Sequence, residues 1–287
     1  MRGTPYNQGD GFKLARDLPP NLRPEVAGDW AACHSTCWDF DSPKDGGSRD
    51  LTNAYTKLGY PLGLMLNSQG LRYVDEGADY RNYTYAIYGK ATLGQPGGFA
   101  FQVWDQRGKA MLRVEEYGDD VTKRIEAPSI EKLAQLLEEE GLEDPTAFVK
   151  TLNDYNEAVK AFEAEFPGRT FNPAEKDGLG TQSSAKKLAI PKSNWARILE
   201  EPPFLAVKIT CGITFTFGGL PIDAETAGVL KAGSNETIDG LFCAGEMVGN
   251  VFWGNYPGGS GLTAGAVFGR RAGKEVGRLA KESRREA

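Results

Sequence analysis

The amino-acid sequence predicts an α+β fold derived from an α/β architecture, with one unit inserted into another. A short apolar strand at 241–244 is followed by a glycine-rich loop and by a helical pattern that runs from Leu262 to the C-terminus. Residues 61–74 have the pattern of a β-hairpin. Helices with clear capping residues follow between 129 and 168. Strands and helices mixed in this way are typical of an α+β protein.

The bulk composition is that of an ordinary globular protein. The chain has 287 residues, enough for a sizeable core and two structural units, with 40% hydrophobic and 25% charged residues. The net charge of −6 gives no support for binding to nucleic acid or to an acidic membrane. No apolar run approaches the ~20 residues that cross a bilayer, and the N-terminus lacks the apolar core of a secretory signal. We therefore expect no nucleic-acid partner, no membrane span and a cytoplasmic location.

The cysteines and the single histidine do not form a recognisable metal motif. Cys33 and Cys37 make a C-x-x-x-C pattern around His34, but no second pair completes a zinc site. The other cysteines, Cys211 and Cys243, are isolated in the sequence. We therefore expect no metal, and buried free thiols in a reducing compartment. His34 would have to serve any nucleophile–histidine chemistry, which the sequence does not favour.

The stretch that precedes residue 106 predicts strands joined by loops. Residues 43–50 have the composition of a loop. Strands at 61–67 and 71–74, around a turn at 68–70, form the predicted hairpin, and 98–105 is a further strand.

Two helices follow with clear start and stop signals. The first, 130–140, begins after the capping residue Ser129 and ends at Gly141. The second begins at Pro145, a favoured first position, after the capping residue Asp144. Its apolar residues fall on one face, which is typical of core packing rather than of a cofactor site: Phe148, Leu152, Tyr155, Val159, Phe162 and Phe166.

The remaining sequence leads to the glycine-rich region. Residues 171–191 are polar and loop-like, and 204–210 is a strand. A turn at 239–240 then precedes the apolar strand. Glycines at 258, 259 and 261 remove the side chains that would block close approach of a ligand to the free N–H groups of the loop. Gly265, Gly269 and Gly273 recur every fourth residue and predict a smooth helix face for tight packing, since each glycine costs a helix about 1 kcal/mol.

This region resembles the flavin-binding segment of the fumarate reductase/succinate dehydrogenase flavoprotein superfamily. The resemblance rests on a strand that ends in A-G-E and on N-Y-P-G-G-S-G-L-T-A-G-A-V-F-G-R-R-A-G at 255–273. It is most similar to the tricarballylate dehydrogenase branch, with the 3-ketosteroid Δ1-dehydrogenases as a more distant relative. The resemblance implies FAD as the cofactor and the following cofactor-binding residues: Gly245, Glu246, Gly258, Gly259, Ser260, Gly261, Leu262 and Thr263.

By the same resemblance, residues 1–58 are a remnant of the FAD-binding domain, 59–205 are a capping domain, and 206–287 are the C-terminal part of the FAD-binding domain. Residues 5–15 resemble the turn and helix that lie well inside the flavin domain of this family. The sequence lacks the G-x-G-x-x-G element that holds the FAD pyrophosphate. We therefore expect the C-terminal portion of a flavoenzyme, either truncated or completed by a partner chain, that by itself binds FAD weakly or not at all.

The resemblance also implies catalytic residues. Arg107 lies close to the place where fumarate reductases carry a proton-shuttling arginine, with Arg113 as the alternative. Glu76 and Arg81 are expected behind it as a relay or substrate clamp, the alternative being a surface ion pair of little energetic value. Tyr256, at the mouth of the glycine loop, is expected to donate a hydrogen bond to a substrate oxygen, the alternative being a packing residue.

Two departures from the family argue against fumarate or succinate as the substrate. The paired histidines of the fumarate reductases fall at Thr214 and Phe215, and the arginine of their last glycine loop falls at Tyr256. We therefore expect an FAD-dependent oxidoreductase that acts on a C–C bond of a small carboxylate or ketone, with an electron-transfer partner. Two alternatives stay open: a non-catalytic remnant or subunit that needs an FAD-bearing partner, and a 3-ketosteroid Δ1-dehydrogenase-like enzyme.

Overall fold

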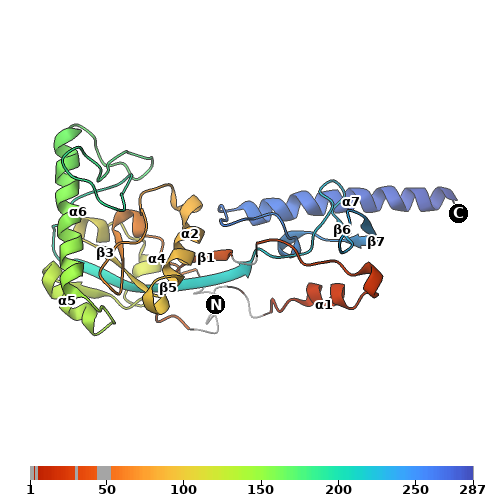
Figure 1. Ribbon diagram of the computed structural model, residues 1–287, viewed down its shortest axis with the longest axis horizontal. Coiled ribbons are helices and arrows are strands. Elements are labelled where there is room, and N and C mark those ends of the chain that lie inside the picture. The colour runs from red at the N-terminus through yellow and green to blue at the C-terminus, as the bar shows by residue number, and fades with distance from the viewer. Residues whose placement is uncertain (1–2, 4–5, 30–31, 44–52, 287) are drawn as a thin grey trace. The chain divides into compact units, whose positions relative to one another are not determined.

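The chain divides into two compact units, which are described separately. The computed structural model (Figure 1) describes residues 3, 6–29, 32–43 and 53–286. Unit 1 takes in residues 35–212, and unit 2 takes in residues 3–34 and 213–287. Unit 1 therefore contains the whole range 59–205 that the sequence assigns to a capping domain, together with residues 35–58. All but the first residue of the predicted loop at 43–50 lies outside the described residues.

Unit 1 is built on a mixed set of strands and helices. Its helices are α2 (Arg81–Leu93), α3 (Gln106–Lys109), α4 (Val114–Tyr117), α5 (Ile130–Glu138) and α6 (Pro145–Glu165), with short 3-10 turns at Tyr60–Leu62 and Pro96–Gly98. The strands are β1 (Cys33–Asp39), β2 (Leu64–Asn67), β3 (Ala100–Trp104), β4 (Ile125–Ala127) and β5 (Phe204–Thr216). They form one sheet in the order β1-β5-β3-β2, with β4 also paired to β5. The pairings of β3 with β2 and with β5 are antiparallel.

The two predicted capped helices are confirmed, and so are their start signals. The Ser129 side chain accepts a hydrogen bond from the N–H of Lys132 at 3.1 Å. The Asp144 carboxylate accepts one from the N–H of Ala147 at 2.8 Å. Gly141, beyond the end of α5, has a φ of +99°, the left-handed conformation that favours glycine.

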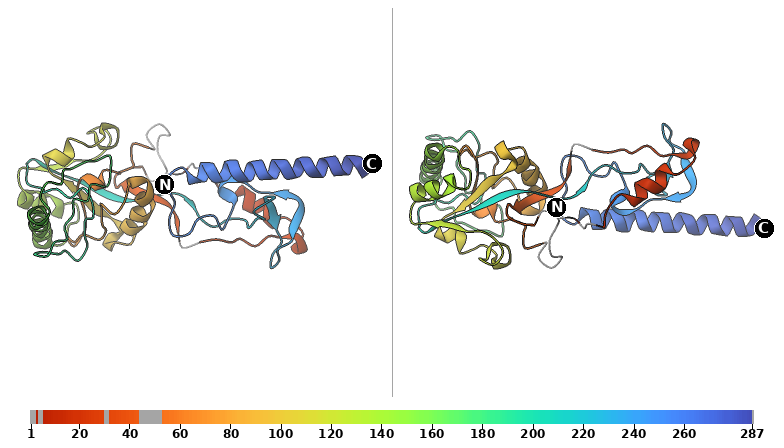
Figure 2. Two further views of the ribbon diagram at one scale, coloured as in Figure 1. Left: turned by 90° about the horizontal axis from the view of Figure 1, so that it is seen from above. Right: turned by 90° about the horizontal axis from the view of Figure 1, so that it is seen from below.

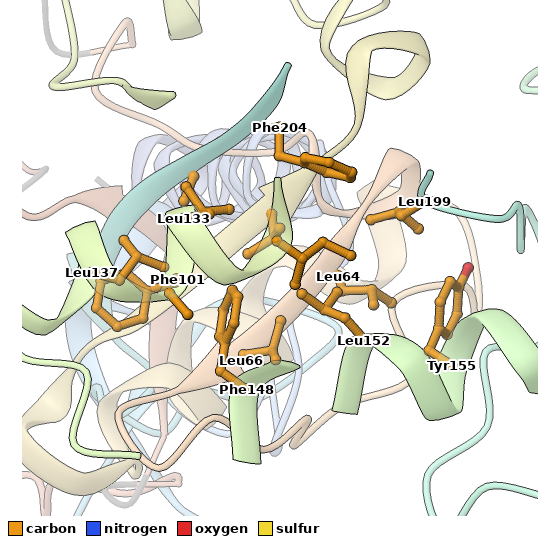
Figure 3. Close-up of a cluster of buried hydrophobic side chains, with 14 of the residues drawn as sticks. Leu64, Leu66, Phe101, Leu133, Leu137, Phe148, Leu152, Tyr155, Leu199 and Phe204 are labelled. Atoms are coloured by element: carbon orange, nitrogen blue, oxygen red, sulfur yellow. The ribbon is translucent and has the colours of Figure 1, made fainter. Parts of the chain in front are cut away.

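The apolar stripe of α6 forms core, as predicted. Phe148, Leu152 and Tyr155 are fully buried, and Figure 3 shows them beside Leu64 and Phe101 of the sheet strands. Val159 and Phe162 are also buried, whereas Phe166, at the end of the stripe, is only half-buried. The stripe therefore joins α6 to the sheet and leaves no room for a cofactor on this face.

The predicted hairpin is only partly correct. Residues 64–67 form β2, but 71–74 form no strand, and a single bridge joins Leu66 to Arg72. The Asn67 side chain accepts hydrogen bonds from the N–H groups of Gln69 and Leu71, both at 3.0 Å, and so stabilises the turn. Beyond the bridge the chain turns inward, because Arg72 forms a buried ion pair with Glu76 instead of continuing the ladder.

The strand predicted at 98–105 is confirmed as β3, whereas the strand predicted at 204–210 is longer. β5 continues to Thr216, and together with β1 it carries the chain between unit 1 and unit 2. Strand β1 itself was missed. Its sequence, C-H-S-T-C-W-D, mixes polar and apolar residues without alternation, and all but its first residue are buried.

Unit 2 has fewer regular elements. They are α1 (Asp10–Arg16), a 3-10 turn at Pro20–Leu22, β6 (Gly228–Leu230), β7 (Thr237–Phe242), a 3-10 turn at Gly245–Met247 and α7 (Ser260–Glu286). β6 and β7 pair antiparallel. The turn predicted at 239–240 lies inside β7, and Gly240 has a φ of +74°, which accounts for its turn-like sequence signal.

The helix predicted from Leu262 is confirmed as α7, but its glycine face is used at one position only. A side chain at Gly265 would lie 3.7 Å from the Cα of Gly245. A side chain at Gly269 or Gly273 would meet no atom of the described chain within 4 Å. Figure 2 shows the last turns of α7 extending past the other elements of unit 2. The expectation of tight packing along all three glycines is therefore not met within the described residues.

Candidate functional site: a glycine loop and an arginine-lined cavity

The turn after β7 presents an acidic side chain without a partner. Gly245 has a φ of +82°, and a side chain there would meet no atom within 4 Å. Glu246 follows in an exposed 3-10 turn, and its carboxylate has no hydrogen bond or ion pair to any described residue. Partial burial raises the pKa of the Glu246 carboxyl. An acid set at the end of a strand without a partner is available to accept hydrogen bonds from a ligand.

The start of α7 presents free backbone donors. The N–H groups of Gly258, Gly259 and Leu262 have no acceptor within the described part of the chain. Gly259 has a φ of +85° with open space where a side chain would stand, and Leu262 is 85% exposed. Free N–H groups at the start of a helix of this length attract a negatively polarised ligand atom.

Tyr256 is fastened to the same helix start. Its ring is 8% exposed, and its hydroxyl oxygen accepts a hydrogen bond from the N–H of Gly261 at 2.8 Å. A side chain at Gly261 would stand 2.2 Å from this oxygen, so glycine is required there. Because the oxygen accepts this bond, the hydroxyl proton stays available for another acceptor.

Aromatic rings surround Tyr256 within unit 2. The His34 ring lies edge-on to it at a centroid distance of 4.3 Å, and the Phe252 ring lies at 4.7 Å. Phe215 and Phe217 complete the cluster at 5.2 and 6.3 Å. The sequence analysis did not place His34 at the site, because no partner motif accompanies it. The only sequence signal for a role of His34 was that it is the single histidine of the chain.

The structure brings the predicted cofactor residues together in unit 2. Gly245, Glu246 and Gly261 line one small cleft with Phe252. The other loop residues, with the exception of Leu262, line a neighbouring groove of about 500 Å³: Gly258, Gly259, Ser260 and Thr263. All of these residues come from the segment between β7 and the first turns of α7.

In unit 1, Glu76 does not form the surface ion pair with Arg81 that was the alternative to a relay or substrate clamp. Its side chain is fully buried, and its carboxylate pairs with the Arg72 guanidinium and accepts a hydrogen bond from the N–H of Met65 at 2.8 Å. Arg72 in turn donates to the carbonyl oxygen of Ile190 at 2.7 Å. Every polar atom of this pair has a structural partner, so the pair holds the segment after β2 against the segment before β5.

Arg107 is likewise held by its neighbours. Its guanidinium lies 3.2 Å from the Asp105 carboxylate and 3.3 Å from that of Glu201, and it donates to the carbonyl oxygen of Ile198 at 2.6 Å. The side chain is about one third exposed. Arg107 therefore fastens α3 to the chain before β5.

Arg81 and Arg113, by contrast, line one cavity of about 530 Å³ in unit 1. Arg81 is the first residue of α2, and Arg113 directly precedes α4. The cavity also includes Glu116, which is 4% exposed and which sequence reasoning missed. The structure thus separates Arg107 and Glu76 from the two arginines that face a space large enough for a ligand.

A glycine loop with an unpartnered acid and free N–H donors is suited to a ligand with hydroxyl groups and negatively polarised atoms, and comparison with known families identifies the class of ligand. The model of the FAD binding domain family matches residues 3–262. The chain belongs to this family, within the fumarate reductase/succinate dehydrogenase flavoprotein superfamily, and FAD is the cofactor that the family indicates.

Curated relatives are oxidoreductases. The chain is 29% identical over 222 residues to a fumarate reductase (cytochrome) of Shewanella frigidimarina, an alignment that covers 77% of this chain and 33% of that protein. It is 28% identical over 234 residues to the 4-oxocyclohex-2-ene-1-carboxylate 5-dehydrogenase of Sinomonas cyclohexanicum, which covers 78% of this chain and 37% of that protein. The chain thus spans little more than a third of the length of these relatives.

Solved structures show the same fold. A flavocytochrome c3 fumarate reductase in its open conformation matches with a TM-score of 0.57 and 26% identity, over 93% of this chain and 39% of that one. A 3-ketosteroid Δ1-dehydrogenase from Sterolibacterium denitrificans matches with a TM-score of 0.64 and 19% identity, over 95% and 47%. At that identity, the second likeness shows the fold alone.

The residues present fit the flavin. A carboxylate accepts hydrogen bonds from hydroxyl groups, and backbone N–H groups donate to carbonyl oxygens. Glu246 and the N–H groups of Gly258, Gly259 and Leu262 supply both kinds of group on one segment. Among the described residues no group of three or more His, Cys, Asp or Glu is placed to hold a metal ion. Nor does the described part of the chain contain a helix long and apolar enough to cross a bilayer.

Proposed function

We propose that this chain belongs to an FAD-dependent dehydrogenase or reductase that acts on a C–C bond beside a carboxylate or ketone. Within that enzyme, we propose that this chain holds the isoalloxazine ring of the flavin. The observation that carries the proposal is the Tyr256 hydroxyl, which is held by the N–H of Gly261 at the start of α7, on the segment that carries Glu246. The names of the relatives support this class of reaction. Tricarballylate is one candidate substrate.

The cofactor, when bound, accepts or donates the hydride. Glu246 would hold hydroxyl groups of the cofactor, and the N–H groups of the glycine loop would stabilise negative charge on it. Tyr256 would donate its proton in a hydrogen bond to a substrate carbonyl or carboxylate oxygen. This bond makes the adjacent C–H more acidic, and the Gly261 N–H stabilises the charge that grows on the phenol oxygen.

The proton on the neighbouring carbon needs a second group, for which we propose an arginine. The resemblance favours Arg107, with Arg81 and Glu76 behind it. The geometry supports Arg81 and Arg113 more strongly, because both line the cavity and Arg107 does not. Because an arginine side chain holds its proton very strongly, this role requires a neighbouring carboxylate that exchanges the proton, and Glu116 lies 2.9 Å from Arg113.

Further parts of the proposal concern the whole protein. We assign 1–58 and 206–287 to an FAD-binding domain and 59–205 to a capping domain, and we propose an electron-transfer partner. We also propose a cytoplasmic location, since none of the four cysteines is joined in a disulfide within the described chain, as is usual in a reducing compartment.

Two other functions each have one supporting observation. The aromatic cluster around Tyr256 would suit a larger apolar substrate, as in a ketosteroid dehydrogenase. The exposed apolar residues Leu262, Val267 and Val276 on α7 would suit a subunit that docks onto an FAD-bearing partner.

Flavin titration tests the proposal. FAD is added to the purified chain and binding is followed by quenching of flavin fluorescence, with Glu246→Ala as the variant. We expect the dissociation constant to rise at least tenfold in Glu246→Ala, because the carboxylate has no other partner. Glu225→Ala, which removes an exposed acid elsewhere in unit 2, is the matched control. Weak binding by the unaltered chain agrees with the expectation for an isolated portion of a flavoenzyme, and equal affinity in the two variants would refute the assignment of Glu246.

A further inference from the structure

The cavity of unit 1 has an uneven distribution of charge. Arg113 is neutralised, since its guanidinium lies 2.9 Å from the Glu116 carboxylate and 3.9 Å from that of Glu115. Arg81 has no hydrogen bond or ion pair to any described residue. The cavity therefore contains one arginine in an ion pair and one, Arg81, that is exposed and outside any ion pair, although the nearby Glu116 carboxyl interacts with its charge.

Arg81 also stands at an unfavourable place for a cation. It is the first residue of α2, a helix of 13 residues, and its N-cap Tyr80 makes no capping hydrogen bond with its side chain. The positive end of a helix repels a positive side chain and attracts an anion. An anion in the cavity would relieve this repulsion and pair with the guanidinium at the same time.

The rest of the cavity wall is largely apolar. Tyr80 and Tyr83 stand on either side of Arg81 in the sequence, and Leu112 and Trp195 line the cavity as well. Its volume of about 530 Å³ lies within the range of pockets that hold ring-sized ligands, roughly 300–1,000 Å³. A four-carbon diacid would leave most of this apolar wall without contacts.

A second carboxylate on the ligand would find no unpaired cation other than Arg81 among the described residues that line the cavity. Arg113 already pairs with Glu116, and a further carboxylate beside it would be repelled by the acid. The cavity thus offers one place for a negative charge and a larger space for an uncharged, apolar body.

We propose that this cavity binds an organic monocarboxylate with an apolar ring or chain, whose carboxylate pairs with Arg81 and whose body lies between the aromatic walls. The binding of such a molecule to this cavity does not depend on the proposed function. Its identity as the substrate does depend on the proposed function.

Isothermal titration calorimetry of the chain without flavin tests the binding. The probes are cyclohexanecarboxylate, succinate and cyclohexanemethanol, which separate the contributions of charge and of the apolar ring. We expect cyclohexanecarboxylate to bind at least tenfold more tightly than either of the others. Arg81→Gln should weaken cyclohexanecarboxylate binding at least tenfold. Lys90→Gln, which removes an exposed cation from the last turn of the same helix, should leave it unchanged.

Two variants, Arg81→Gln and Leu112→Ala, separate effects on binding from effects on folding. Leu112→Ala should weaken the binding of cyclohexanecarboxylate severalfold and leave the binding of acetate unchanged. A thermal melt of Arg81→Gln checks that this variant is folded. Succinate binding as tight as cyclohexanecarboxylate, or unchanged affinity in folded Arg81→Gln, would overturn the proposal. If cyclohexanecarboxylate binds as expected but the flavin titration refutes the role of Glu246, the proposed function is wrong and the proposal for the cavity is still supported. If the flavin titration succeeds but cyclohexanecarboxylate does not bind as expected, only the proposal for the cavity is wrong.

Discussion

Unit 1 and unit 2 differ in how completely their residues find partners within the described chain. In unit 1, β2, β3, α5 and α6 enclose a core in which Phe148, Leu152 and Leu133 are fully buried. In unit 2, the apolar cluster around Val229 and Ile238 is smaller, and none of the described side chains of α7 is buried. Unit 1 is therefore stabilised mainly by its own core, whereas unit 2 leaves donors, an acid and an apolar helix face available for other molecules.

Cavity-forming substitutions should expose this difference most strongly. Phe148→Ala removes a fully buried ring from unit 1 and should lower the free energy of unfolding by about 3–5 kcal/mol. Phe268→Ala, on α7, removes a half-buried ring and should lower it by less than about 1.5 kcal/mol. Urea unfolding followed by far-ultraviolet circular dichroism measures both. Equal losses in the two variants would contradict the contrast between the units.

Removal of the Tyr256 hydroxyl tests whether this group takes part in catalysis as a hydrogen-bond donor to the substrate. Tyr256→Phe keeps the ring in its aromatic cluster and removes only the oxygen that accepts from Gly261. In the flavin-loaded enzyme we expect kcat to fall roughly 10²-fold, the usual range for loss of a positioned acid. Flavin content, read from the absorbance, should stay the same. Unchanged turnover would make Tyr256 a packing residue and move the search for the polarising group to unit 1.

Buried lysines should give unit 1 a dependence of stability on pH. Lys192 is 1% exposed, and its amine donates to the carbonyl oxygen of Gly63 at 2.6 Å. Burial lowers the pKa of Lys192 from 10.5 to about 8. Between these values the unfolded chain binds the proton and the folded chain does not, so stability rises with pH across this window. The rise from this group amounts to about 1.5 kcal/mol between pH 8 and pH 9.5.

The slope can be assigned by substitution. Burial lowers the pKa of Lys57 to about 8 as well, whereas burial raises the pKa of the Cys37 and Cys243 thiols and so opposes the rise. Lys192→Met should therefore reduce the change in stability between pH 8 and pH 9.5 by about 1.5 kcal/mol, its own contribution, and leave the contributions of the other groups. Lys176→Met, which removes an exposed lysine, is the control and should keep the full slope. Urea unfolding at a series of pH values measures the effect. A Lys192→Met protein with the unaltered slope would show that the buried amine keeps an ordinary pKa.

Local features were predictable from the sequence because contiguous residues encode them. Ser129 and Asp144 lie three residues before the N–H groups that they cap, and the apolar stripe of α6 repeats with the period of a helix. The glycine loop and Glu246 belong to one short segment, so their order in the chain already places them together. The start of α7 follows from the same segment, since it lies directly after the Tyr-Pro-Gly-Gly run.

Tertiary structure decided what depends on residues far apart in the chain. Arg72 rather than Arg81 pairs with Glu76 because the buried segment before β5 supplies carbonyl oxygens more than 100 positions away. Arg81 and Arg113 share a cavity because the fold brings the start of α2 and the residue before α4 to the same space, which no spacing in the sequence reveals. The sequence by itself thus determined the composition of the glycine-loop segment for which we propose flavin binding, where neighbours in the chain are neighbours in space. Only tertiary structure decided which arginines are available, because an ion pair depends on which distant acid the fold brings within reach.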